Sequence, residues 1–130
     1  MASYFVLFIA FSIIGGIIDA IYCSIEKRKL THGTVIPLFS PMYGIGGIIL
    51  ILIFRHLQAN FAIQIIVATF VLTMIELLGG LFCVHILKKR VWDYSRSRWN
   101  FQGHIDLLHS FYWLMLSALT GIILAYAGVI

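Results

Sequence analysis

The chain has 130 residues, of which 62% are apolar and only 11% are charged. An average soluble domain carries roughly 45–50% apolar and about 25% charged residues, and a chain this short cannot bury so much apolar surface in water. The composition argues against a soluble enzyme, a disordered segment and a secreted disulfide scaffold, and it predicts an all-α, polytopic membrane protein.

The formal net charge of +4 does not indicate a nucleic-acid partner. The nine lysines and arginines occur in short groups between apolar runs, as they do in the loops of membrane proteins. We therefore expect the lipid bilayer as the partner, and no nucleic acid. The two cysteines, Cys23 and Cys83, are too few for a disulfide framework, and we interpret them as packing residues.

Four apolar runs follow one another along the chain. A bilayer core of about 30 Å requires about 20 helical residues. The runs that approach this length cover residues 3–25, 36–54, 61–87 and 107–130, and Pro37 and Pro41 lie near the start of the second. They predict a compact bundle of four transmembrane helices that forms a single integral-membrane domain over residues 1–130.

The basic residues also predict the orientation. The first run is followed by Lys27, Arg28 and Lys29 and lacks a basic segment before it, so we expect a membrane span here and no cleaved signal peptide. If the N-terminus lies outside, loops 1 and 3 face the cytoplasm and hold every basic residue except Arg55. An even number of spans then places the C-terminus outside as well. We expect a multi-pass protein of a bacterial cytoplasmic membrane.

Small and polar residues predict which side of each helix faces the protein, because apolar residues carry no directional signal in lipid. They recur at steps of three or four, which places them on one face of a helix. The expected interior stripes are Ser12, Gly15 or Gly16, Asp19 and Cys23; Tyr43, Gly44 and Gly47; Thr69, Thr73, Glu76, Gly80 and Cys83; and His109, Trp113, Ser117 and Gly121.

Glu76 lies well inside the third run, where an acidic side chain costs about 2.5–3.5 kcal/mol on insertion scales. Such a residue faces a partner or a water-filled cavity, so we interpret it as a candidate site. The alternative is a structural hydrogen bond to Thr73, a histidine or a tyrosine. Asp19 lies nearer the cytoplasmic end, where it can reach Lys27 or water.

The histidines do not have the spacing of a metal site. His104 and His109 are five residues apart and would point about 140° away from each other on one helix. We expect no metal and no cofactor, and we expect Asp106 or Ser110 to satisfy His109. A metal site built from acidic, thiol and imidazole groups remains the alternative, and its ligands would be Asp19, Glu76, Cys83 and His109. No nucleophile elbow, phosphate loop or dinucleotide fingerprint occurs in the sequence, so we expect no enzymatic activity.

The most specific stretch lies between the third and fourth runs. It contains Trp92-Asp93-Tyr94-Ser95 and then Asn100-Phe101-Gln102-Gly103-His104-Ile105. Its aromatic residues also suit an interfacial belt. With Asp19, Gly33, Pro37, Pro41 to Gly44 and Glu76, the order of these segments resembles the ABC-transporter permease type IV (CmpB-like) family of small membrane proteins.

The resemblance implies a four-helix membrane fold and a transport-related role. That family usually has arginine where this chain has His32 and His104, and glutamate where it has Asp19. A fixed cation has thus been replaced twice by a group that titrates near neutral pH. Any anion-binding role of the family is therefore not carried over to this chain.

The leading hypothesis for function is a transport-related or solute-binding membrane component. The expected site binds a small solute between the helices and consists of Asp19, Glu76, Asn100, His104, His109 and Trp113. A translocation path through so small a bundle requires a homo-oligomer or a larger transporter partner. The alternative hypothesis is a non-transporting scaffold or regulatory subunit that packs against another membrane protein, and an intramembrane enzyme is the weakest of the three.

Overall fold

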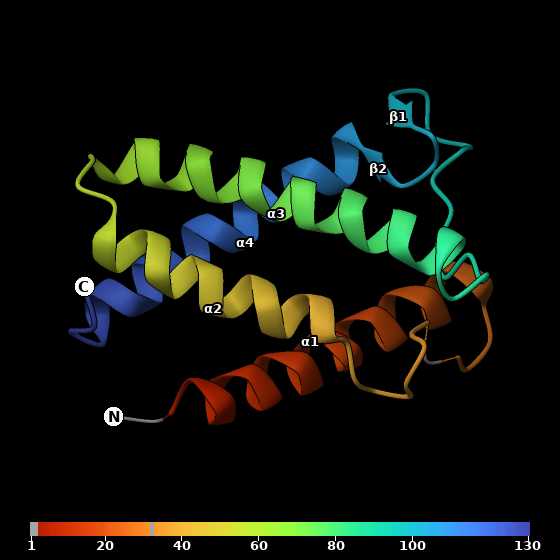
Figure 1. The fold of residues 1–130 in the computed structure, drawn as a ribbon, viewed down its shortest axis with the longest axis horizontal. Coiled ribbons are helices and arrows are strands. Elements are labelled where there is room, and N and C mark those ends of the chain that lie inside the picture. Colours follow the sequence, from red (N-terminus) through yellow and green to blue (C-terminus); the bar gives the residue numbers. More distant parts are fainter. Residues whose placement is uncertain (1–2, 32) are drawn as a thin grey trace. The chain divides into compact units, whose positions relative to one another are not determined.

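The computed structural model describes residues 3–31 and 33–130, and over these ranges it is mostly helical (Figure 1). Its elements are α1 (Tyr4–Lys27), α2 (Pro41–His56), α3 (Phe61–His85), β1 (Asn100–Phe101), β2 (Ile105–Asp106) and α4 (Leu107–Tyr126). Within the described ranges, α1, α3 and α4 are long and apolar enough to cross a membrane. These helices fit an integral membrane protein, as the composition predicts.

The second expected span is shorter than predicted. The prediction of a helix from residue 36 is wrong, because α2 begins at Pro41 and has 16 residues. Proline suits the first position of a helix, where no N–H is needed. Before it, Leu38 adopts a positive φ of 56° and Ile36 forms an isolated bridge with Phe39. This left-handed residue ends the extended segment in a tight turn and prevents an earlier start of the helix.

Other boundaries differ less. α1 continues to Lys27, whereas α3 ends at His85 and α4 at Tyr126. The all-helical prediction also missed β1 and β2, which pair antiparallel through Asn100 with Asp106 and Phe101 with Ile105. A ladder of two residues per strand is too short to produce a periodic pattern in the sequence.

Polar side chains cap the first turns of three helices. The hydroxyl of Ser3 accepts from the N–H of Val6, the amide oxygen of Asn60 accepts from Ile63, and a carboxyl oxygen of Asp106 accepts from His109. The N–H groups at the start of a helix have no partner within it, and in lipid they find no water. These caps therefore explain where α1, α3 and α4 begin.

The chain divides into two compact units, Met1–Ile48 and Ile49–Ile130. In the N-terminal unit, Ser12, Gly15 and Gly16 are buried on α1. A Cβ added at Gly15 would collide with Tyr43, and one added at Gly44 would collide with Ser12. Small residues thus let the two backbones of this unit approach closely.

In the C-terminal unit, α3 packs side by side with α4 (Figure 1). Thr73 donates a hydrogen bond to Ser110 across the two helices, with 3.3 Å between the hydroxyl oxygens. The amide of Gln64 donates to the carbonyl oxygens of Phe54 and Leu57 and thereby fixes the turn before α3. The residues buried on these helices are Gln64, Ala68, Leu72, Thr73, Glu76 and Gly80 on α3 and Trp113, Ser117 and Gly121 on α4.

Candidate functional site

Glu76 lies on the buried face of α3, and only 2% of its surface is exposed. The indole N–H of Trp113 donates a hydrogen bond to Oε2 at 2.8 Å, and the hydroxyl of Tyr94 donates one to Oε1 at 2.9 Å. A buried carboxyl group is strongly destabilising unless its oxygens have donors. Here a different part of the chain supplies the donor to each oxygen, since Trp113 belongs to α4 and Tyr94 to the loop before it.

The ring of Tyr94 is held from a second side. It stacks on the imidazole of His109 with 3.8 Å between ring centroids and 8° between the ring planes. His109 Nδ1 lies 2.6 Å from Oδ1 of Asp106, the residue that caps α4. These contacts connect five polar and aromatic side chains into one group, which we call the Glu76 cluster. Its members are Glu76, Tyr94, Asp106, His109 and Trp113.

Tyr94 reaches Glu76 because the segment between α3 and α4 folds back on itself. We call residues 86–106 the α3–α4 loop. The backbone N–H of Tyr94 donates to the carbonyl oxygen of Gly103, and the indole N–H of Trp92 donates to that of His104, at 2.9 and 2.8 Å. These two bonds cross the loop and fix the residues on either side of Asp93, so that the Tyr94 hydroxyl is directed into the helix pair.

The return of the loop depends on Asn100 and Gly103. The side chain of Asn100 donates to the carbonyl oxygen of Ser97 at 2.6 Å and accepts from the N–H of Gly103 at 2.9 Å. Gly103 has a φ of 72°, and a Cβ there would lie 2.5 Å from Oδ1 of Asp93. Glycine is therefore required at this position both by the backbone and by the space around it.

Two titratable groups outside the helices have shifted pKa values. The N–H of Ser95, and secondarily Arg90, holds the pKa of Asp93 below its usual range. Burial lowers the pKa of His104 below 6.5, and the nearby charges of Arg90 and His85 act in the same direction. His104 is 3% exposed, and a Cβ at Gly80 would lie 2.5 Å from its Nδ1. The imidazole therefore packs against α3 and favours the neutral form.

The sequence profile of one family, described as "Putative ABC-transporter type IV", matches residues 6–127. The chain belongs to this family. The resemblance expected from the sequence is thereby confirmed. No curated protein and no solved structure matches the chain.

The site residues expected for this member of the type IV family fall into three groups. Glu76, His109 and Trp113 come together in the Glu76 cluster. Asn100 and His104 lie in the α3–α4 loop, where Asn100 bonds the backbone and His104 packs on Gly80. The remaining residue, Asp19, belongs to the N-terminal unit.

Asp19 has its own partner there. The hydroxyl of Tyr43 lies 3.1 Å from Oδ1 of Asp19 and donates to it. This bond links two positions that the sequence placed on interior stripes of neighbouring helices. His32, which replaces an arginine of the family pattern, lies outside the described residues.

Two members of the Glu76 cluster did not appear among the predicted ligands. Tyr94 suited an interfacial aromatic belt as well as the family motif, and nothing in its local sequence indicates that it turns inward. Asp106 was expected as one of two partners for His109, and the bond between them confirms that expectation. A tyrosine was one of three partners named in the structural alternative for Glu76, and Tyr94 is such a partner.

The alternative of a metal site receives no support. Among residues 3–31 and 33–130, no group of three or more His, Cys, Asp or Glu side chains is arranged to hold a metal ion. Cys23 and Cys83 are both free thiols. The Glu76 cluster itself offers hydrogen bonding and charge through two carboxyl groups, an imidazole, a phenol and an indole.

Proposed function

We propose that the chain is a transport-related membrane component that binds a small solute at the Glu76 cluster. The observation that carries the proposal is the pair of hydrogen bonds to Glu76, one from Tyr94 and one from Trp113. An acidic residue in a membrane-length helix is costly and marks a functional site by default. Membership in a transporter-type family supports the same reading.

The cluster favours a solute with hydrogen-bond donors or a positive charge, because Glu76 and Asp106 offer acceptor oxygens. Each oxygen of Glu76 already accepts one bond from its own chain, and the carboxyl group is almost fully enclosed. We infer that a solute takes the place of one donor, although each oxygen keeps a further lone pair. Trp113 is buried on α4, whereas Tyr94 belongs to a loop. We therefore infer that the Tyr94 hydroxyl is the group displaced, and that the solute approaches from the side of the α3–α4 loop.

The proposal includes the orientation and assembly expected from the sequence. Four helices would form one bundle with both termini outside and with loops 1 and 3 in the cytoplasm of a bacterium. The protein would act without enzymatic chemistry, together with further copies of itself or with a larger transporter partner. The excess of lysine and arginine in loops 1 and 3 supports this orientation, because basic loops tend to remain in the cytoplasm.

A second candidate is a non-transporting scaffold or regulatory subunit. The observation in its favour is that a donor from the chain itself satisfies each oxygen of Glu76. In this case the carboxyl group serves to hold the α3–α4 loop in one shape, and a partner membrane protein recognises that shape.

The two candidates differ in what Tyr94→Phe does. The substitution removes the hydroxyl that competes with a solute but keeps the ring stacked on His109. Solute binding predicts that the purified variant retains more of a small molecule than the wild type, measured by mass spectrometry of the extracted ligand. A scaffold role predicts no retained molecule in either protein, with weaker co-purification of a partner.

Glu76→Gln provides the complementary measurement. It should abolish retention of the solute, because an amide supplies neither the charge nor two acceptor oxygens. Glu26→Gln is the matched control, since Glu26 is an exposed acid at the end of α1. Equal ligand content in wild type, Glu76→Gln and Glu26→Gln would contradict the proposed solute site.

A further inference from the structure

A groove of about 400 Å³ lies where the α3–α4 loop meets the start of α4. It is separate from the Glu76 cluster and shares no residue with it. Four of its six lining residues are apolar and two are polar. The lining residues are Ser97, Arg98, Trp99, Leu107, Leu108 and Phe111.

The loop side of the groove is fixed in place. The carbonyl oxygen of Trp99 accepts a hydrogen bond from the N–H of Leu107, at 2.9 Å, which ties the loop to the first residue of α4. The guanidinium of Arg98 lies over the Trp99 ring, 5.7 Å from its centroid. Trp99 is nevertheless 68% exposed. An exposed tryptophan beside a membrane helix is typical of the headgroup level of a bilayer.

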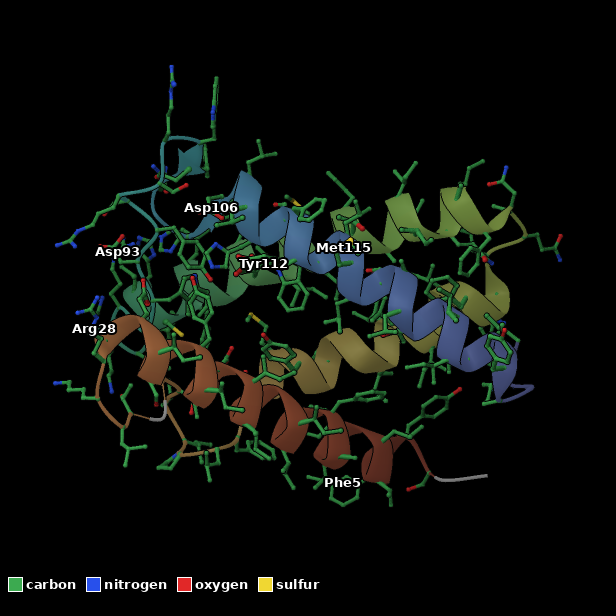
Figure 2. All side chains as sticks on the ribbon, turned by 180° about the vertical axis from the view of Figure 1, so that it is seen from behind. Phe5, Arg28, Asp93, Asp106, Tyr112 and Met115 are labelled. Atoms are coloured by element: carbon green, nitrogen blue, oxygen red, sulfur yellow. The ribbon has the colours of Figure 1, made fainter. Side chains whose placement is uncertain are left out.

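Arg98 supplies a cation at this level. Among the described residues, no acidic side chain lies within ion-pair distance of its guanidinium. The segment 88–106 carries five basic and two acidic side chains, so its net charge is +3. Figure 2 shows side chains that end in nitrogen extending outward near β1. A guanidinium can bind a phosphate through two parallel hydrogen bonds, and basic loops of this kind attract anionic lipids.

The apolar side of the groove continues along α4. Leu107, Phe111, Met115 and Leu119 follow one another at steps of four, and each is more than half exposed. Met115 is labelled on α4 in Figure 2, beyond Tyr112 as seen from Asp106 at the start of the helix. The ridge from Leu107 to Leu119 rises about 18 Å along the helix, which is close to the thickness of about 15 Å of half a bilayer core. This ridge therefore matches the length of an acyl chain in a single leaflet.

We propose that the groove binds one anionic phospholipid, with the phosphate at Arg98 and an acyl chain along the ridge of Leu107, Phe111, Met115 and Leu119. Charge favours this occupant over a zwitterionic lipid, and the length of the ridge favours it over free phosphate. The site does not depend on the role of Glu76. It would anchor the α3–α4 loop at the membrane surface and make the protein responsive to the lipid around it.

The test compares two arginines of the same loop. Wild-type protein in detergent micelles is titrated with dioleoyl phosphatidylglycerol and, separately, with dioleoyl phosphatidylcholine, and native mass spectrometry counts the lipids that remain bound. Arg98→Ala should weaken phosphatidylglycerol binding about fivefold, the effect of one basic residue at a lipid surface. Arg96→Ala removes the same charge outside the groove and should weaken that affinity clearly less than Arg98→Ala does, because only Arg98 lines the groove.

A second variant keeps the proposal testable if Arg98→Ala does not fold. Phe111→Ala removes an exposed ring from the ridge without opening the interior, and it should also weaken phosphatidylglycerol binding. Glycerol 3-phosphate, which carries the phosphate without acyl chains, should fail to compete with the lipid.

Four results would overturn the proposal. Equal effects of Arg96→Ala and Arg98→Ala would show that only the total charge attracts the lipid. Equal binding of phosphatidylcholine would remove the role of charge, and full competition by glycerol 3-phosphate would indicate a free-phosphate site. A dimer that dissociates in Phe111→Ala, with no lipid bound to either protein, would identify the groove as a contact between two copies.

Discussion

Tyr94 and Trp113 donate to different oxygens of Glu76, and the ring of Tyr94 is also stacked on that of His109. Tyr94→Phe isolates the hydrogen bond, because phenylalanine retains the stack on His109. We expect the free energy of unfolding to fall by about 1–3 kcal/mol, the range for leaving a buried polar group unpaired. Denaturant unfolding in micelles, followed by near-ultraviolet circular dichroism, measures the change.

The control for this prediction is Tyr126→Phe, since Tyr126 is 92% exposed at the end of α4. It should leave the unfolding midpoint unchanged. An equal loss of stability in the two variants would mean that the bond between Tyr94 and Glu76 does not stabilise the fold.

His104 predicts a pH dependence with a definite sign. Its pKa is below 6.5 in the folded protein because the imidazole is buried, whereas the unfolded chain titrates near 6.5. Between these two pKa values the unfolded state binds more protons than the folded state. The free energy of unfolding should therefore be constant above this window and fall as the pH drops through it.

Unfolding midpoints measured between neutral and mildly acidic pH test this prediction. His104→Asn should flatten the dependence, even if it lowers the midpoint at every pH. His56→Asn alters an exposed histidine at the end of α2 and should keep the wild-type profile. A wild-type profile in His104→Asn would show that another group is responsible.

At the scale of secondary-structure elements, the α3–α4 loop is the part of the chain that holds much of the family's sequence pattern outside the helices. Its Trp92, Asn100 and Gly103 bond backbone atoms of the same loop. The family motif, which contains the predicted ligands Asn100 and His104, thus builds a turn that directs Tyr94 inward.

Asn100→Ala should loosen this loop without unfolding the helices. It removes the bonds to Ser97 and Gly103, and each such bond contributes about 1 kcal/mol. Backbone N–H groups of residues 94–104 should exchange with deuterium on the order of tenfold faster, while those of α3 keep their protection. Arg96→Ala is the control in the same loop, and comparable acceleration in both variants would contradict the role of Asn100.

The sequence predicts the positions of the helices better than it predicts the loop. Apolar runs of sufficient length place α1, α3 and α4, because insertion in lipid depends on the length and the composition of a run. The predicted start of α2 was wrong. It depends on the turn at Leu38, whose positive φ angle the positions of the two prolines only suggest. The inward turn of Tyr94 could not be predicted, because it depends on bonds to Gly103 and Glu76, which are distant in the sequence.

The same contrast applies within the Glu76 cluster. Trp113 could be expected there, because it lies on the same predicted stripe as Ser117 and Gly121, and the structure buries all three. Asp106 could be expected as a partner of His109, since they are three residues apart at a helix start. No periodicity assigns a loop residue such as Tyr94, and the family motif does not state which way its side chain points.

For the whole molecule, the testable prediction is its orientation in the membrane. Single cysteines at Lys29 and Arg96 would report on loops 1 and 3, and one at Gln58 would report on loop 2. In intact cells a membrane-impermeant thiol reagent should label only the cysteine at position 58, because positively charged loops remain in the cytoplasm. The other two should react after the membrane is opened.

The native thiols must be removed first, by changing Cys23 and Cys83 to Ala. The reverse pattern, with positions 29 and 96 labelled in intact cells, would invert the orientation. Labelling of position 29 without position 96 would contradict the expected number of crossings between the two loops.

The two donors to Glu76 also determine when its carboxyl group can be paired during synthesis. Tyr94 follows Glu76 by 18 residues and Trp113 follows it by 37. A growing chain therefore presents the acidic group of α3 to the membrane before either donor exists, at a cost of about 2.5–3.5 kcal/mol. The apolar residues of α3 outweigh this cost, so α3 can insert first, and both oxygens of Glu76 are paired only once α4 has been made. A chain that stops before Leu107 lacks Trp113 and therefore leaves Oε2 of Glu76 without the donor that it has in the complete helix pair.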